Sequence, residues 1–393
     1  MTKPNNTFCP VPWKELSATP SGTIRLCCSG VQDANISKYD NGSVAKLTDD
    51  LQKAWNTNFF QDVRSKMLNG AHVKACENCY FQDKAGIKSA KSDWLQKYPD
   101  LINENLSSTI NIDQAELLDL RLGNMCNLRC RMCDPYSSSA WMKEWRELGE
   151  LVPQPDEKNW IRLEKNTWPE DPRVWEQLKK VVPSLRVVRL TGGEPFLVTA
   201  NKEFLKYCIQ SGHASHIELN YSTNGTVWDN DLPEIWKHFE KVNLKVSVDG
   251  LHEVNDYIRS PSRFEQVIRN IEKMQELETS SNVVVSIACT VQIYNIFQIS
   301  SLIEFFRNKN LFVKLDFVQD PSHLALGVLP ANLALKARES LLKEAAYPGV
   351  MALIHLLDSK NTSQWNHFIA YTKKIDQLRD QCISKVVPEL ELE

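Results

Sequence analysis

The chain of 393 residues is poor in net charge, in long hydrophobic runs and in glycine. Its 46 lysines and arginines nearly balance 49 aspartates and glutamates, so no global positive field favours nucleic acid or an anionic membrane. No stretch approaches the ~18 apolar residues of a membrane span, and the start MTKPNNTFCP lacks the apolar core of a secretory signal. We therefore expect a soluble, cytoplasmic protein without nucleic-acid or membrane partners. Its 14 glycines are about half of the usual ~7%, so the places where they gather are informative.

Cysteine, by contrast, is abundant and clustered. Eight of the 11 cysteines fall within the first 133 residues, and the total is odd. In a reducing compartment, clustered thiols more often bind metal or carry redox chemistry than form disulfides. The remaining composition, with 42% hydrophobic and 24% charged residues, is that of a globular protein and excludes a mainly disordered chain.

The centre of the chain alternates short β-branched runs with longer helical patterns. Strands and helices at this spacing indicate parallel strands joined by right-handed crossovers. The expected strands are 117–122, 185–190, 217–221, 244–248, 283–290 and 312–318, and two expected crossover helices are 264–277 and 296–306. Six such units predict an α/β fold, either a barrel or an open sheet.

The two ends of the chain differ from its centre. We expect an amino-terminal metal-stapled module, a linker, the α/β domain and a helical carboxyl-terminal cap, at residues 1–90, 91–115, 116–325 and 326–393. The module has five cysteines and one expected helix over 51–68. The cap shows helical patterns over 333–344, 351–357 and 365–383 and no chemical motif.

Three cysteines follow the first expected strand, in the segment Cys126-Asn-Leu-Arg-Cys130-Arg-Met-Cys133. A structural zinc site needs four ligands, usually from two C-x2-C pairs, so three cysteines on one loop leave one coordination position unfilled. Three thiolates suit a 4Fe-4S cluster whose open iron binds an external ligand. The loop lies at the carboxyl end of a strand, where parallel α/β folds build active sites. An incomplete zinc site or a chance cluster of thiols is the alternative.

This segment and the tetrad Gly-Gly-Glu-Pro at 192–195, after the second strand, together resemble the radical S-adenosylmethionine (radical SAM) superfamily. The resemblance implies a partial (β/α)6 TIM-like barrel. It implies that a 4Fe-4S cluster, which binds SAM, is held by Cys126, Cys130 and Cys133. It also implies that the amino group of SAM is held by Gly192, Gly193 and Glu194. A plain strand-to-helix turn is the alternative for an isolated tetrad of this kind.

Two further strand ends carry motifs similar to those of the superfamily, Ser222-Thr-Asn224-Gly and Ser247-Val-Asp249-Gly. The resemblance implies that Ser222 and Asn224 donate to the ribose or carboxylate of SAM. It implies that Ser247 and Asp249 face cofactor or substrate. Arg259 resembles an arginine that clamps the SAM carboxylate, a task that suits a guanidinium. Ordinary turn formation, and a surface position for Arg259, are the alternatives.

The amino-terminal cysteines resemble the SPASM/twitch modules of radical SAM enzymes. The motifs are Cys9-Pro-Val-Pro-Trp13, the pair Cys27-Cys28, Trp55-Asn56 and Cys76-Glu-Asn-Cys79. Such modules normally follow the barrel, whereas these motifs precede it. The resemblance implies one auxiliary 4Fe-4S cluster with the ligands Cys9, Cys27, Cys76 and Cys79, and with Cys28 as the reserve candidate. A tetrahedral zinc site is the alternative.

The remaining cysteines, Cys208, Cys289 and Cys382, lie in helical or strand patterns and are expected to be buried small apolar residues. The insert at 137–180 carries five of the 11 tryptophans. For these, core packing or a subunit contact is favoured over a lid that stacks on a substrate.

The resemblance implies a reductive radical enzyme that receives electrons from a low-potential donor such as flavodoxin or ferredoxin. The first expected activity is the oxidation of a small, sugar-like molecule, assisted by the auxiliary cluster. The alternatives are a peptide or protein maturase with the same chemistry and a metal-binding protein without catalysis. Because no separate amino-terminal domain for binding a leader peptide is visible, the maturase is ranked second.

Overall fold

One mostly parallel sheet runs through the protein. The structure, a computed structural model, describes residues 6–31, 34–84, 88–101, 104–166, 168–278, 282–358 and 362–391. Its strands are β1 (Glu15–Ala18), β2 (Ile24–Arg25), β3 (Leu117–Arg121), β4 (Val187–Thr191), β5 (Glu218–Thr223), β6 (Lys241–Ser247), β7 (Val283–Val291) and β8 (Val313–Phe317). They form one sheet in the order β2-β1-β3-β4-β5-β6-β7-β8.

The six strands from β3 to β8 run parallel and follow the chain order, as the sequence predicts. A parallel pair cannot be joined by a tight turn, so each connection crosses over one face of the sheet. In the described residues β2 and β8 are edges, and the sheet does not close. The predicted α/β fold class is therefore confirmed, as an open sheet.

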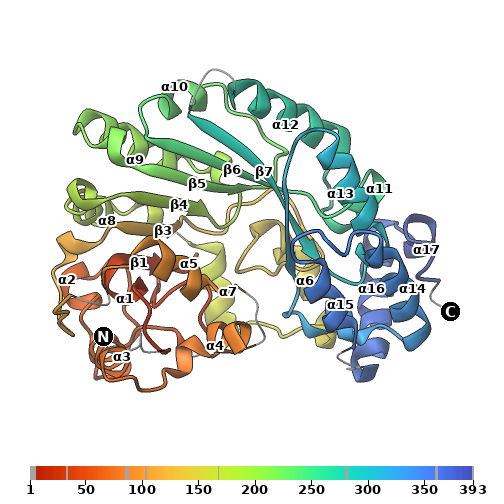
Figure 1. Cartoon of the computed structure of the whole chain (residues 1–393), viewed down its shortest axis with the longest axis horizontal. Coiled ribbons are helices and arrows are strands. Elements are labelled where there is room, and N and C mark those ends of the chain that lie inside the picture. Colours follow the sequence, from red (N-terminus) through yellow and green to blue (C-terminus); the bar gives the residue numbers. More distant parts are fainter. Residues whose placement is uncertain are drawn as a thin grey trace.

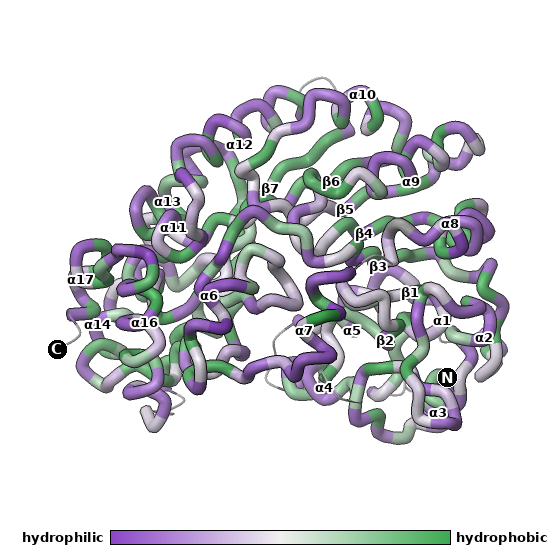
Figure 2. The backbone as a smooth tube through the Cα atoms, turned by 180° about the vertical axis from the view of Figure 1, so that it is seen from behind, coloured by the Kyte–Doolittle hydropathy of each residue, from purple (hydrophilic) through white to green (hydrophobic). Residues whose placement is uncertain are grey.

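Helices cover one face of the sheet (Figure 1). They are α8 (Pro172–Lys179), α9 (Thr199–Gln210), α10 (Leu232–Trp236), α12 (Phe264–Glu278) and α13 (Ile299–Arg307). Beneath them, alternate residues of β6 such as Val242, Leu244 and Val246 are fully buried. The strands are accordingly more hydrophobic than the helix α12 (Figure 2). The opposite face, which we call the inner face, carries the intervening and largely polar residues.

The amino-terminal module joins this sheet directly. Strand β1 pairs in parallel with β3, which sets Ser17 opposite Asp119, and β2 pairs with β1 in the antiparallel direction. All four residues of β1 are buried. The sequence did not predict this pairing, because the run Glu-Leu-Ser-Ala is short and not β-branched.

The module also contains α1 (Val11–Lys14), α2 (Leu51–Ala54), α3 (Asn58–Leu68), α4 (Glu77–Lys84) and α5 (Ala90–Lys97). The single helix predicted over 51–68 is wrong, because the chain breaks between α2 and α3. At the break, the side chain of Asn56 accepts a hydrogen bond from the backbone of Ile110 at 2.9 Å. The hydroxyls of Thr57 and Ser37 lie 2.8 Å apart. These long-range polar contacts replace the helical hydrogen bonds that the spacing alone would favour.

A buried arginine links these helices. The guanidinium of Arg64 is fully buried and donates to the backbone carbonyls of Pro12, Trp55 and Ser108 at 2.9, 2.9 and 3.0 Å. It also donates to the side-chain oxygen of Asn56 at 3.1 Å. Burial lowers its pKa to about 9. The module is thus held together by one polar hub as well as by apolar packing.

Helices dominate the carboxyl-terminal region, as expected. They are α14 (Ala331–Leu342), α15 (Val350–Asp358), α16 (Trp365–Arg379) and α17 (Ile383–Val386). Cys208 and Cys289 are fully buried, in agreement with prediction, whereas Cys382 is exposed and its prediction is wrong. Cys382 lies between α16 and α17, at a helix end rather than within a packed face. None of the described helices has the length and apolar character needed to cross a membrane.

We expect Arg64→Met to lower the free energy of unfolding by at least ~3 kcal/mol, because it leaves several buried carbonyls without a donor. Urea unfolding followed by tryptophan fluorescence measures this. The control is Lys66→Met on the same helix, whose ion pair with Asp62 is exposed, and its effect should stay below ~0.5 kcal/mol. Equal stability of the two variants would contradict the role of Arg64 as a hub.

Candidate functional site

The three central cysteines lie on one loop after β3, which we call the cysteine loop (residues 124–138). Cys130 is buried, and Cys126 and Cys133 are half-buried. The backbone N–H of Cys133 donates to the carbonyl of Cys130 at 2.9 Å and closes a turn. The backbone N–H groups of Arg129 and Arg131 donate to Ser260 and Ile258 at 2.6 and 2.8 Å. The loop therefore rests on the end of α11 (Glu253–Ile258).

The side chain of Arg131 ties this loop to the carboxyl-terminal helices. Its guanidinium is fully buried and donates to Asp376 at 2.5 Å and to Gln381 at 2.8 Å. It also lies 3.5 Å from the ring centroid of Tyr257. The hydroxyl of Tyr371, on α16, donates to the carbonyl of Arg131 at 2.7 Å. Sequence reasoning missed this link, since its partners lie more than 200 residues away and carry no motif.

The tryptophan-rich insert packs behind the same loop. The indole N–H of Trp141 donates to the carbonyl of Cys130 at 2.9 Å, and the hydroxyl of Ser138 donates to that of Leu128 at 2.6 Å. Glu144, on α6 (Met142–Glu147), binds the guanidinium groups of both Arg129 and Arg379. All five tryptophans of the insert lie in the hydrophobic core or pack against it. The predicted core packing is confirmed.

Glu194 joins the loops that follow β4 and β5. Its carboxylate is fully buried and accepts hydrogen bonds from the backbone of Phe196, the hydroxyl of Thr223 and the backbone of Asn224, at 3.1, 2.7 and 2.7 Å. Burial raises its pKa, although these donors favour the charged form. The observed role of Glu194 is to connect two loops. Contact with the amino group of a ligand stays a prediction.

Gly193 is required by the neighbouring backbone. It adopts φ +54°, and a Cβ at this position would lie 2.2 Å from the carbonyl oxygen of Met125. The next N–H, of Glu194, donates to that same carbonyl at 2.7 Å. The loop after β4 therefore packs directly against the start of the cysteine loop.

Asn224 brings the loop after β5 to the cysteine loop as well. Its amide nitrogen lies 2.9 Å from the side-chain oxygen of Asn127 and 3.8 Å from the sulfur of Cys126. Ser222 and Ser247 are half-buried on the inner faces of β5 and β6. Among the described residues, the structure therefore brings Asn224, but neither Ser222 nor Ser247, into hydrogen-bond contact with a cysteine.

Asp249 and Arg259 form a buried ion pair beside the loop. The guanidinium donates to the carboxylate at 2.6 Å, and the backbone N–H of Thr290 donates to the other carboxylate oxygen at 2.7 Å. Asp249 is fully buried, so it positions Arg259 rather than facing solvent. The Nε of Arg259 is buried and has no hydrogen-bond partner among the described residues.

Charge and hydrogen bonding favour a thiolate at Cys130. A hydrogen bond from Cys133 and the positive charge of Arg259 lower the pKa of Cys130 to about 7, against the opposing effect of burial. The hydrogen bond to Cys130, together with burial, raises the pKa of Cys133, and burial raises that of Cys126. Burial lowers the pKa of Arg259, but the Cys130 thiolate and Asp249 outweigh it and raise that pKa. Thiolates are the form in which cysteines bind metals, so this donor set fits a metal centre with an open position.

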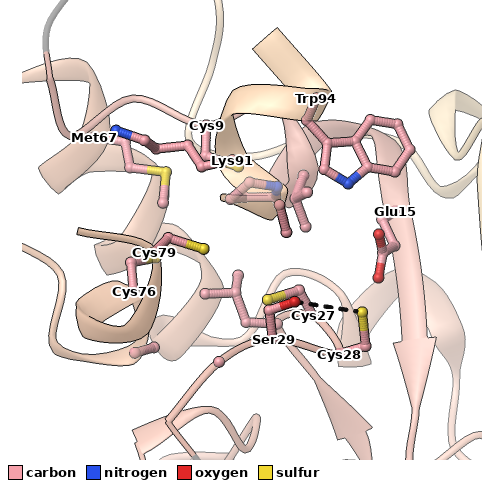
Figure 3. A pocket seen from close by; sticks show the side chains of 16 residues that line it. Cys9, Glu15, Cys27, Cys28, Ser29, Met67, Cys76, Cys79, Lys91 and Trp94 are labelled. Atoms are coloured by element: carbon pink, nitrogen blue, oxygen red, sulfur yellow. Dashed lines mark hydrogen bonds between the residues drawn. The ribbon is translucent and has the colours of Figure 1, made fainter. Parts of the chain in front are cut away.

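The amino-terminal cysteines gather in one pocket (Figure 3). Its walls include Val11, Leu26, Met67 and Ala75, and its cysteines are Cys9, Cys27, Cys28, Cys76 and Cys79. Burial raises the pKa of each of these thiols, and it raises that of Cys76 to about 12. In such an apolar place thiolates need a nearby cation, so this donor set also fits a metal centre.

Adjacent cysteines of this pocket point in different directions. Figure 3 shows the sulfur of Cys27 on the side that faces Cys79, whereas the sulfur of Cys28 is turned toward Glu15. Cys28, Glu15 and Asp119 have ligand atoms within 4.8 Å of one another. Arg189 reaches the sulfur of Cys28 at 3.8 Å. This arrangement favours Cys27 over Cys28 as the fourth member of the cysteine set.

Charged residues on the inner face border the amino-terminal cysteine pocket. Arg25 and Asp119 form an ion pair at 2.8 Å, and Arg189 lies 3.5 Å from the carboxylate of Glu15. Burial raises the pKa of Glu15 to about 7, although Arg189 opposes that shift. This cluster was not predicted from the sequence. Strands of a buried parallel sheet are normally continuous apolar runs. The charged residues within these strands could therefore have indicated the cluster.

Two family models match the chain. Residues 120–305 match the radical SAM superfamily, and residues 9–80 match an iron-sulfur cluster-binding domain, SPASM. Among curated proteins, the sporulation killing factor maturation protein SkfB of Bacillus subtilis (strain 168) is 26% identical over 195 residues. These residues are 49% of this chain and 40% of the relative, so the match spans less than half of that protein.

Solved structures show distant likeness. The structure of native anSMEcpe with bound AdoMet is 22% identical, with a TM-score of 0.38, over 52% of this chain and 52% of that chain. Streptococcus suis SuiB bound to S-adenosylmethionine is 14% identical, with a TM-score of 0.34, over 78% of this chain and 64% of that chain.

The orientation of the paired cysteines predicts unequal effects on iron binding. After anaerobic reconstitution, we expect about eight irons per chain in the unmodified protein and about four in Cys27→Ala. Cys28→Ala, the matched control, should keep about eight, because its sulfur points away from the other thiols. An iron assay with absorption spectra measures this, and the reverse order would identify Cys28 as the ligand.

The contact between Gly193 and Met125 predicts a local steric effect. In Gly193→Ala the added methyl group should displace the cysteine loop and lower the iron content by about half. Gly212→Ala is the control, since Gly212 has φ +78° but no atom within 4 Å of an added Cβ. It should cost about 1 kcal/mol of stability and keep its iron. Equal iron contents in the two variants would contradict the steric argument.

Proposed function

Because this chain is a radical SAM protein with an amino-terminal SPASM domain, we propose that it modifies a peptide or small protein by hydrogen-atom abstraction. The observation that carries the proposal is the similarity to a maturation protein, SkfB. The expected oxidation of a small, sugar-like molecule has no comparable support. The maturase therefore takes precedence over the activity that the sequence analysis ranked first.

The cofactors are SAM and 4Fe-4S clusters. We assign the SAM-binding cluster to Cys126, Cys130 and Cys133, which share one loop with a buried, unpartnered Arg259 Nε beside them. We assign the auxiliary cluster to Cys9, Cys27, Cys76 and Cys79, which line one apolar pocket. When bound, the first cluster and SAM supply reductive cleavage of the sulfonium and a carbon radical that removes hydrogen from a substrate.

The chain's own residues fix the position of the first donor set. Arg131 and Trp141 hold the backbone around Cys130 from two sides. Glu194 and Asn224 join the loops after β4 and β5 to the same place. Arg259, held by Asp249, presents positive charge there, which suits the predicted contact with the SAM carboxylate. Radical chemistry requires that the protein hold the reacting groups in fixed positions, and these contacts provide such placement.

The inner face is where we propose that the substrate lies. Glu15 and Cys28 line the auxiliary pocket, and Glu15 and Asp119 belong to the inner face of the sheet. Arg121 ends β3, directly before the cysteine loop. A substrate on this face would therefore lie between both donor sets. We propose that electrons come from a low-potential protein donor such as flavodoxin or ferredoxin.

The test is anaerobic incubation of the reconstituted protein with SAM and dithionite, with 5'-deoxyadenosine measured by chromatography. The unmodified chain should form 5'-deoxyadenosine, and Cys126→Ala should form none above background, because the first cluster loses a ligand. Cys382→Ala is the control, since Cys382 is an exposed cysteine outside both groups. It should retain full activity. If the unmodified chain formed no 5'-deoxyadenosine, the proposed enzymatic activity would be rejected.

The substrate class is tested with synthetic peptides encoded by short reading frames beside the gene. A change in peptide mass that requires SAM and dithionite would support the maturase. The maturase would be rejected if 5'-deoxyadenosine formed and a small sugar-like molecule, but no peptide, were modified. That result would support the oxidation of a small molecule instead.

A further inference from the structure

Four side chains form one row across the inner face of the sheet. Arg121 on β3 is paired in register with Thr191 on β4, and Ser222 on β5 is paired with Lys245 on β6. Thr191 and Ser222 each follow the paired residues Leu190 and Tyr221, so the row is continuous. All four residues are partly exposed. Two cations thus stand at the ends of a row with two hydroxyls between them.

These two cations have no direct polar partner among the described residues. The side chains of Arg121 and Lys245 make no hydrogen bond or ion pair with any residue that the structure describes. The Nε of Arg121 is buried without a partner. Burial and the nearby Arg25 lower the pKa of Arg121, although Asp119 and Glu15 oppose this shift. Burial, Lys314 and Arg189 lower the pKa of Lys245, and Asp316 opposes them. Each cation therefore lies near carboxylates but forms a direct ion pair with none of the described residues.

The neighbouring carboxylates are already engaged. Asp119 is paired with Arg25 at 2.8 Å, Asp316 with Lys314 at 3.0 Å, and Glu15 lies 3.5 Å from Arg189. Deeper in the sheet, Glu218 accepts hydrogen bonds from the amides of Asn220 and Asn243 at 2.8 and 2.9 Å. Arg121 and Lys245 consequently have no carboxylate in direct contact. Unpaired and partly buried cations are costly unless a ligand supplies the opposite charge.

We propose that Arg121 and Lys245, with the hydroxyls of Thr191 and Ser222 between them, bind a carboxylate of the substrate. This inference rests on the proposed peptide substrate, whose carboxylate is either an acidic side chain or the free carboxyl terminus. A guanidinium offers a forked pair of donors that matches a carboxylate, and the Ser222 hydroxyl and an ammonium add further donors. The Thr191 hydroxyl donates to Asp119 at 3.4 Å and would turn from it to the ligand. The row begins at Arg121, five residues before the first cysteine of the loop, so the site would anchor the peptide beside that loop.

The test measures retention of short synthetic peptides by the reconstituted full chain in the presence of SAM, by ultrafiltration and mass spectrometry. One pool carries Asp or Glu and an amidated terminus, a second has no acidic residue but a free terminal carboxylate, and a third has neither. We expect about tenfold preference for one of the first two pools over the third, the gain of a charge-assisted hydrogen bond. The preferred pool identifies the source of the carboxylate.

The double variant Arg121→Gln with Lys245→Gln should lose this preference while its affinity for SAM changes less than about twofold. The matched control is Lys241→Gln, an exposed residue at the opposite end of β6, which should keep the preference. Loss of SAM affinity with an unchanged preference would mean that the cations bind SAM, and would overturn the inference.

Two outcomes in the unmodified chain separate this inference from the proposed function. Equal retention of all three pools would overturn the carboxylate site and leave the peptide substrate in place. Retention of no pool, together with normal formation of 5'-deoxyadenosine, would overturn the peptide substrate and this inference with it.

Discussion

The geometry of the first cysteine group depends on one buried guanidinium. In the sequence, Arg131 lies between Cys130 and Cys133, and its side chain is fully buried. Its charge is balanced by Asp376, which also accepts hydrogen bonds from the hydroxyl of Tyr257 at 2.7 Å and the backbone of Ile383 at 2.8 Å. Because a buried charge is tolerated only when it is paired, the cysteine loop and the carboxyl-terminal helices must assemble together. The helical cap is therefore part of the site's framework.

The second constraint is the pairing of β1 with β3, which fixes the two cysteine groups relative to each other. Cys9 lies a few residues before β1, and the cysteine loop follows β3 at the carboxyl end of the sheet. Hydrogen bonding between neighbouring strands sets their separation and register. The unusual order of the two domains along the chain thus still yields one continuous sheet, to which the amino-terminal module contributes β1 and β2 (Figure 1).

Local patterns predicted most of the sheet and the two cysteine groups. The strands from β3 to β8 alternate with amphipathic helices, and their signals lie within each segment, so all six were predicted. Contacts between distant segments were not predicted. The break between α2 and α3, the pairing of β1, and the partners of Arg131 and Glu194 all arise from residues that come together only on folding. The exposure of Cys382 has the same origin, because burial depends on what packs against a helix end.

The position of β1 between β2 and β3 has a consequence for shortened forms of the chain. Removing the amino-terminal module would leave β3 as an unpaired edge with exposed backbone donors and acceptors, a template for association with other chains. The α/β domain and the module therefore form a single structural unit. Truncation or transfer of either part alone requires a new cover for that edge.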